Sequence, residues 1–134
     1  MLNYEDANLS GEIAFIKRLF SFKDNGQMVV LDIGANDGGY SKIVRRFSKN
    51  ARIYAFEAHP ITFQKLEKNA STFDFTAFCL ACSDREGRFI LYDYADKNGS
   101  SHATLCEEVF KKFHRAISTE NEISAVRLDD FVLN

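Results

Sequence analysis

The residues best suited to chemistry are two acids and the small residues between them. Residues 29–40 read V-V-L-D-I-G-A-N-D-G-G-Y, so that Asp32 stands two positions before Gly34. Glu57 follows about 20 residues later, where nucleotide-binding βαβ units carry the acid that holds ribose hydroxyls. Glycines let the backbone approach a ligand closely, and the start of a helix offers N–H groups to an acidic ligand. The pattern predicts a nucleotide-type cofactor site.

The elements around these residues bring the two acids together. Residues 28–33 read as a strand buried on both faces, and a helix follows whose apolar positions Tyr40, Ile43, Val44 and Phe47 have helical spacing. Residues 52–57 form a second strand that ends in Glu57. Parallel strands in βαβ units end at the same edge of the sheet, so we expect Asp32 and Glu57 to face one ligand.

The remaining patterns extend this alternation of strand and helix. A helix begins near Glu12, after a candidate N-cap at Ser10, and another begins at Pro60 with an inward face of Ile61, Phe63, Leu66 and Ala70. Strands are predicted at 73–81, 88–94 and 123–128, with a helix around Val109, Phe110, Phe113 and Ile117. We therefore predict an α/β protein with a mostly parallel sheet, an N-terminal helical segment at 1–27 and a cofactor domain at 28–134.

The central turn separates two cofactor classes. Dinucleotide enzymes carry G-x-G-x-x-G, whereas the pattern here is G-A-N-D-G-G, with Asn36 where the second glycine should let pyrophosphate approach. S-adenosylmethionine instead ends in an amino acid. Asp32 can accept a hydrogen bond from the ammonium group of that amino acid, directly or through water. Asn36 and the N–H groups of the turn can meet its carboxylate. This favours S-adenosylmethionine over NAD.

The third predicted strand places Ser83 and Asp84 at the same edge. Asp84 could accept a hydrogen bond from the adenine amine, and Ser83 could help to hold the turn. Two alternatives need no ligand: Asp32 caps the following helix, and Asp84 forms an Asx turn. For Asp32 with Glu57 we favour the cofactor role, whereas for Asp84 the two roles stay open.

At these positions the chain resembles a known family. The ordered set V-L-D-I-G-A-N-x-G, Y-A-F-E-A-H-P, C-S-D-R-E-G and V-R-L-D-D-F is similar to FkbM-type S-adenosylmethionine-dependent methyltransferases. The resemblance implies a Rossmann-like class I methyltransferase fold and O-methylation of a hydroxyl on a sugar, polyketide or related metabolite. The family usually has acid–Pro–x–Pro where this chain has Glu57-Ala-His-Pro60. The residues expected to bind the cofactor are Asp32, Gly34, Ala35, Asn36, Gly38, Tyr40, Ser41, Glu57, Ser83 and Asp84.

The resemblance also implies a second half of the sheet that this sequence does not contain. Family members continue into a further strand, K-I-D-V-E-G, whereas this chain ends at Asn134. The first strand would then be an apolar edge, which favours association with another chain or a homo-oligomer. Part of the acceptor pocket would be absent too, so catalysis by this chain alone is in question. A non-catalytic remnant that binds the cofactor or only a partner chain remains an alternative, beside an NAD-binding Rossmann oxidoreductase.

Other candidate sites are less specific. The residue types and spacing of a zinc site are present in Cys79, Cys82, His102 and Cys106. Cys79 and Cys82 are three apart, however, and strand residues three apart point to opposite faces. We therefore expect free thiols and no metal. Methyl transfer to oxygen needs mainly positioning and sometimes a base. His102, in a polar loop before a helix, is our candidate for that base or for a substrate contact.

The composition limits the setting. The chain has 134 residues, a net charge of −2, three Cys and no basic stripe, so nucleic-acid binding is not favoured. It has neither an apolar run of roughly 20 residues nor a secretion signal at its start. We expect a cytoplasmic protein that binds a small-molecule or glycan acceptor and no membrane.

Overall fold

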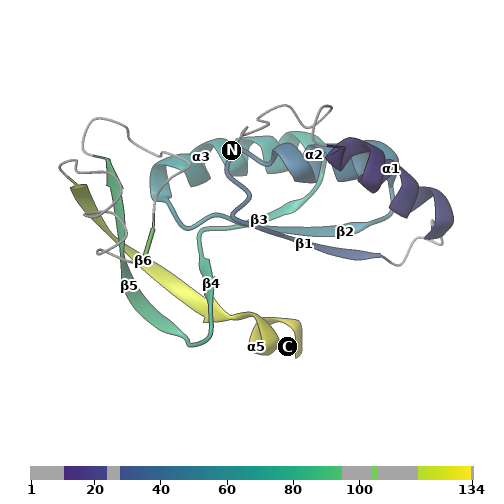
Figure 1. Ribbon diagram of the computed structural model, residues 1–134. Helices are drawn as coiled ribbons and strands as arrows, with labels where there is room; N and C mark the ends of the chain where they lie inside the picture. Colours follow the sequence, from purple (N-terminus) through teal and green to yellow (C-terminus); the bar gives the residue numbers. More distant parts are fainter. Residues whose placement is uncertain (1–10, 24–27, 95–103, 106–117, 134) are drawn as a thin grey trace.

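The protein folds into two small sheets with helices on one side of the first. The computed structural model describes residues 11–23, 28–94, 104–105 and 118–133 (Figure 1). The predicted strand–helix alternation is confirmed in the N-terminal half. In chain order its elements are α1 (Glu12–Lys23), β1 (Val29–Ile33), α2 (Gly39–Phe47), β2 (Arg52–Phe56), α3 (Pro60–Phe73) and β3 (Thr76–Phe78).

The first sheet has the parallel order β1-β2-β3, joined by the crossover helices α2 and α3. Asp32 pairs in register with Ala55, so β1 and β2 end together as predicted. Among the described strands, β1 pairs only with β2 and is therefore an edge, as expected from the sequence. In this edge strand Val29 is 47% exposed and Ile33 is 52% exposed.

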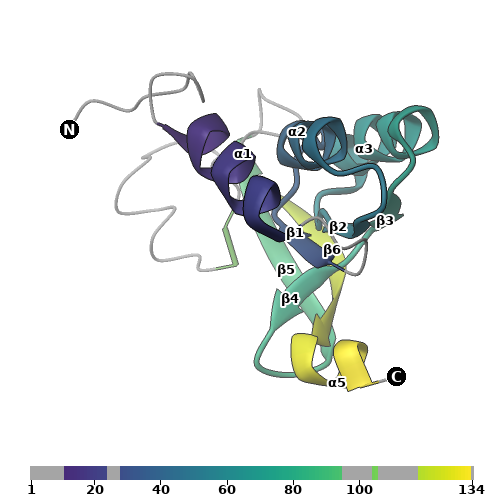
Figure 2. The same cartoon turned by 90° about the vertical axis from the view of Figure 1, so that its right-hand side faces the viewer.

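Helices α1, α2 and α3 lie side by side over one face of this sheet (Figure 2). Ile16 and Phe20 of α1, Val44 of α2 and Ile53 of β2 form one buried cluster. In α3 the predicted inward face is partly wrong. Ile61 is 37% exposed, and the buried row is instead Thr62, Leu66 and Ala70, which repeat at every fourth residue along one helix face.

The second sheet comprises β4 (Ala81–Ser83), β5 (Gly87–Tyr94) and β6 (Ser118–Arg127) in the order β4-β6-β5. Strands β4 and β6 are parallel, whereas β5 and β6 are antiparallel. The prediction of one strand over residues 73–81 is therefore wrong. Phe73 ends α3, β3 spans only Thr76–Phe78, and the chain leaves the first sheet before β4 begins. An apolar run predicts a strand but does not say which distant strand it pairs with.

Helix α5 (Leu128–Leu133) packs against the face of the first sheet that α1–α3 leave open. The ring of Phe131 makes edge contacts with Tyr54, Phe56 and Phe78, with ring centroids 5.0–6.0 Å apart. Arg127 Nε forms an ion pair with Asp130 Oδ2 at 3.6 Å. The V-R-L-D-D-F motif thus has a structural role, because its phenylalanine joins the end of β6 to the first sheet.

Some predictions lie outside the described residues, namely the N-cap at Ser10, the helix around Val109 and Ile117, and the positions of His102 and Cys106. None of the helices in the described part of the chain has the length and apolar character that crossing a bilayer requires.

Candidate cofactor-binding site

The turn after β1 is shaped by residues that tolerate left-handed backbone. Gly34 has φ +73°, Asn36 has φ +51° and Gly38 has φ +84°. Glycine adopts this region without steric cost, and asparagine enters it more readily than most other residues. The N–H groups of Gly34 and Ala35 both donate to the Phe56 carbonyl at 2.9 Å, which fastens the turn to the end of β2.

The glycines of the turn serve different purposes. A Cβ at Gly38 would lie 2.9 Å from both Leu66 Cδ1 and Phe75 Cζ, so Gly38 allows the start of α2 to pack closely on its neighbours. A Cβ at Gly34 would meet nothing within 4 Å. Gly34 therefore faces open space where a ligand could approach, whereas Gly38 is needed for packing.

Asp32 caps helix α2 from a distance. Its Oδ2 accepts hydrogen bonds from the backbone N of Ser41 at 3.0 Å and from Ser41 Oγ at 2.6 Å. Gly38, the N-cap residue of this helix, has no side chain to do so. Asp32 thus makes the helix cap that the sequence offered as the less favoured alternative to a cofactor role. Ser41 is fully buried, so its hydroxyl holds the acid rather than facing the pocket.

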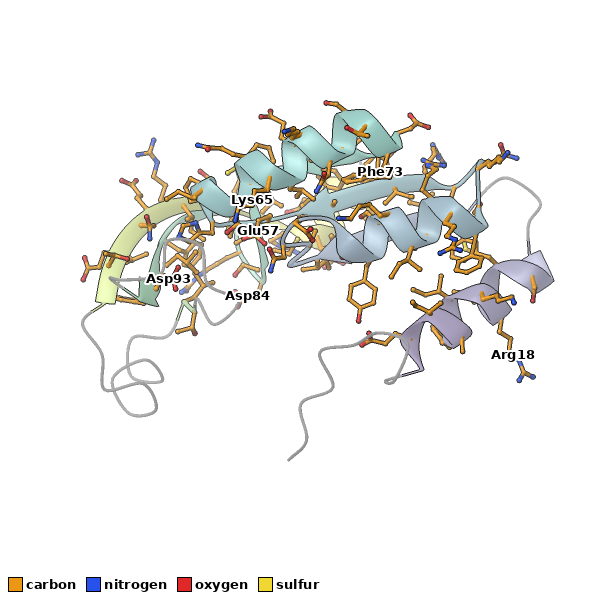
Figure 3. The ribbon with its side chains drawn as sticks, turned by 90° about the horizontal axis from the view of Figure 1, so that it is seen from above. Arg18, Glu57, Lys65, Phe73, Asp84 and Asp93 are labelled. Atoms are coloured by element: carbon orange, nitrogen blue, oxygen red, sulfur yellow. The ribbon has the colours of Figure 1, made fainter. Side chains whose placement is uncertain are left out.

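Glu57 joins the two turns at the sheet edge. Its Oε2 accepts from the backbone N of Asn36 at 2.9 Å, and its Oε1 accepts from the backbone N of His59 at 2.8 Å. A carboxylate offers about four acceptor positions, so these two bonds leave capacity for a ligand. In Figure 3 Glu57 lies toward the same end of the molecule as Asp84 and Asp93, far from Phe73.

A pocket of about 280 Å³ opens beside Glu57 at the carboxyl ends of β1 and β2. Its walls come from both sheets, and it brings together three of the predicted residues: Gly34, Asn36 and Glu57. Ligands of open α/β sheets bind in this crevice. The lining residues are Ile33, Gly34, Asn36, Phe56, Glu57, Ala58, Thr62, Leu80, Ala81, Cys82 and Leu91.

The other predicted residues lie elsewhere. Ala35 is buried beneath the turn. Ser83 ends β4 in the second sheet and Asp84 follows it; Ser83 Oγ donates to Asp84 Oδ1 at 3.1 Å, and neither residue lines the pocket. The sequence predicts them at the pocket because it predicts a single strand at 73–81 that ends at the same edge of the first sheet.

Tyr40 lies on the first turn of α2, beside α1, and is 43% exposed. A hydrogen bond to the Glu12 carboxylate is the main cause that raises the pKa of Tyr40 to about 12, with burial and the charges of Glu12 and Asp32 adding to it. Tyr40 thus links α1 to the helix that follows the glycine turn, and it does not line the pocket.

Cys79 and Cys82 are free thiols, and Cys82 forms part of the pocket wall. Burial raises the pKa of both thiols, and the nearby charges of Glu57 and Glu67 raise that of Cys79 further. A raised pKa disfavours the thiolate, the form that attacks electrophiles or binds metal. Within the described ranges no three His, Cys, Asp or Glu side chains are grouped as metal ligands.

His59 is not among the predicted site residues, yet it is only 2% exposed and pairs with Asp93 of β5. A His directly before a Pro at a predicted helix start was the available signal, since N-cap side chains accept helix N–H groups. Its partner Asp93 is 34 positions away along the chain and on another sheet, and no local pattern connects the two.

Parallel β-α-β-α-β topology with a pocket at the carboxyl ends of its strands defines a Rossmann-like α/β domain. The family model of the methyltransferase FkbM domain matches residues 32–134, and the chain belongs to this family.

One relative with a known name is 2-O-methyltransferase NoeI of Sinorhizobium fredii, which is 28% identical over 130 residues. The match covers 86% of this chain and 51% of NoeI, so the chain spans about half the length of that relative.

Parts of this chain are also similar to parts of solved structures. A precorrin-6y C5,15-methyltransferase from Geobacter metallireducens is 25% identical, with a TM-score of 0.41, over 49% of this chain and 36% of that one. An rRNA methylase from Streptococcus thermophilus is 15% identical, with a TM-score of 0.41, over 52% of this chain and 39% of that one.

Proposed function

We propose that this chain forms the cofactor-binding part of an S-adenosylmethionine-dependent methyltransferase that methylates a hydroxyl on a sugar or small metabolite. Membership of the FkbM family and the 2-O-methyltransferase among its relatives support this assignment. The observation that carries it is Glu57, whose carboxylate borders the pocket while it holds the turn through the N–H of Asn36.

The residues around the pocket fit S-adenosylmethionine. Glu57 keeps acceptor capacity for ribose hydroxyls, and the open space at Gly34 lets a ligand approach the turn. Asp32 is our proposed partner for the cofactor ammonium, at the end of the neighbouring strand. When bound, the cofactor supplies an electrophilic methyl group on its sulfonium.

The contribution of the chain itself is to bind and orient. Leu80, Ala81 and Leu91 give the pocket an apolar wall on the side of the second sheet, which suits the flat face of a base. Ser83 and Asp84, our proposed contacts to the adenine, directly follow the pocket-lining residues Ala81 and Cys82 along the chain. His102 remains our candidate for the group that takes the proton of the acceptor hydroxyl.

Calorimetry with S-adenosylhomocysteine and, separately, with NAD tests the proposal. We expect S-adenosylhomocysteine to bind and NAD not to bind. Glu57→Gln should weaken binding about tenfold or more, because an amide nitrogen must then face one of the two N–H groups that the carboxylate accepts from. Glu67→Gln, on the exposed side of α3, is the matched control and should bind normally. Binding of NAD alone would overturn the proposal.

We also propose that β1 pairs with a second copy of the chain along the edge that none of the described strands covers. Val29 and Ile33 expose apolar surface there, and native proteins often protect such edges with lysine. Light scattering across a concentration series should detect a dimer, and Val29→Lys with Ile33→Lys should shift it to monomer. A wild-type monomer at all concentrations would contradict this proposal.

A further inference from the structure

A buried histidine–aspartate pair connects the two sheets next to the pocket. His59 Nε2 lies 3.3 Å from Asp93 Oδ2, and the two side chains are 3% and 1% exposed. His59 is the N-cap residue of α3, and Asp93 lies near the end of β5. Groups this polar are buried only when they are hydrogen-bonded, so the pair must be maintained for the two elements to stay together.

The hydrogen bonds of His59 assign its protonation. Nδ1 accepts from the backbone N of Ile61 at 3.3 Å, so that nitrogen carries no proton. The proton of the neutral ring is therefore on Nε2, directed at the Asp93 carboxylate. A histidine can accept from the helix and donate to the acid at the same time, since its two nitrogens point in different directions.

The same residue holds Glu57. The backbone N of His59 donates to Glu57 Oε1, and Glu57 Oε2 in turn accepts from the N of Asn36. A chain of contacts thus runs from Asp93 through His59 and Glu57 to the glycine turn. On β5, Leu91 lies two residues before Asp93 and shares its face, and Leu91 is part of the pocket wall.

We propose that His59 and Asp93 are positioning residues for the cofactor site. By anchoring the His59 ring, Asp93 fixes the His59 N–H that orients the Glu57 carboxylate, and it holds the β5 wall against the end of β2. This inference rests on the proposed function, because it makes the pair necessary for the geometry of the residue assigned to the ribose hydroxyls.

Two substitutions at His59 separate its two hydrogen bonds. Asparagine places an acceptor near the position of Nδ1, so His59→Asn keeps the helix cap but loses the bond to Asp93. Glutamine places a donor near the position of Nε2, so His59→Gln keeps the bond to Asp93 but loses the cap. Glu122→Gln removes the exposed Arg88–Glu122 ion pair on β5 and β6 and is the control.

Amide hydrogen exchange at Asn36, measured without any ligand, is the first readout. The Asn36 amide donates to Glu57 and not to either substituted side chain, so a change there reports Glu57. We expect His59→Asn to speed its exchange about tenfold relative to the Ser48 amide, which donates to the Val44 carbonyl at the end of α2. His59→Gln and Glu122→Gln should change it less than about threefold. A purely structural role would speed both amides equally, and that result would overturn the proposal.

The affinity for S-adenosylhomocysteine is the second readout. His59→Asn should weaken it about tenfold in the wild-type background but have no further effect in Glu57→Gln, because both changes act through one carboxylate. Additive losses would overturn the proposal. Asp93→Ala should match His59→Asn, and if that variant does not fold, the two His59 variants decide. Failure of the wild type to bind would refute the proposed function, while the exchange at Asn36 would still test the pair.

Discussion

The carboxylate of Asp32 and the hydroxyl of Ser41 lie 2.6 Å apart, at the point where the first strand meets the second helix. The same carboxylate oxygen also accepts from the Ser41 backbone N. Asp32 therefore compensates for the glycine at the N-cap of α2. Its negative charge is also stabilised by the partial positive charge at the N-terminus of the helix. The acid that we propose for the cofactor ammonium is held in place by the fold before any ligand binds.

Because Ser41 supports Asp32 without facing the pocket, its loss should affect stability more than binding. Ser41→Ala should lower the free energy of unfolding by about 1–2 kcal/mol, a fall in melting temperature of roughly 4–7 °C. Its affinity for S-adenosylhomocysteine should stay within about threefold of the wild type. Asp32→Asn should lower both the free energy of unfolding and the affinity for S-adenosylhomocysteine, the affinity by about tenfold. Equal losses of affinity in the two variants, measured by calorimetry, would contradict separate roles.

The two left-handed glycines of the turn should respond differently to alanine. Gly38→Ala combines a positive φ with two contacts of 2.9 Å, so we expect a loss of about 2–4 kcal/mol in unfolding free energy. Gly34→Ala faces open space and should cost only about 1–2 kcal/mol, from its backbone conformation alone. Chemical denaturation of both variants checks this order, and a Gly34 variant less stable than the Gly38 variant would contradict it.

Phe131 should be important for stability although it lies on a short helix. Its ring contacts three aromatic rings of the first sheet, so Phe131→Ala should destabilise the protein by roughly 3 kcal/mol. Phe15, which is 66% exposed on α1, provides a control whose replacement by alanine should cost little. Thermal unfolding followed by near-ultraviolet circular dichroism should separate the two, and similar melting temperatures would argue against the packing role.

The contact between Tyr40 and Glu12 should make stability depend on pH in the alkaline range. The folded state raises the pKa of Tyr40 from 10.0 to about 12, so it holds the phenol proton more tightly than the unfolded state does. The stabilisation is therefore complete below pH 10 and is lost as the pH rises toward 12. Denaturation midpoints should be measured from about pH 9 to about pH 11, roughly 1 pH unit on either side of the ordinary tyrosine pKa. Over this range the midpoint of the wild type should fall by more than that of Tyr40→Phe. Parallel curves would contradict the assignment.

Much of the site could be predicted from the sequence because its signals are local. Asn36 and Gly34 mark a left-handed turn, and Glu57 is placed by the repeat length of a βαβ unit. Ser83 and Asp84 do not line the pocket, because the predicted strand at 73–81 is divided between β3 of the first sheet and the start of β4 in the second. The contact between His59 and Asp93 could not be predicted, since it joins residues with no shared pattern.

The sequence by itself determined the parallel βαβ unit, the glycine turn after β1 and the acid at the end of β2, because periodicity and turn chemistry act over a few residues. Only the tertiary structure decided that Asp32 caps α2, that β4 leaves the first sheet and that Phe131 closes its open face. Those outcomes depend on which distant surfaces pack together, and packing is a property of the whole fold. The sequence V-L-D-I-G-A-N therefore predicts a strand and a turn, but the pocket beside it is formed only with Glu57 and residues of the second sheet.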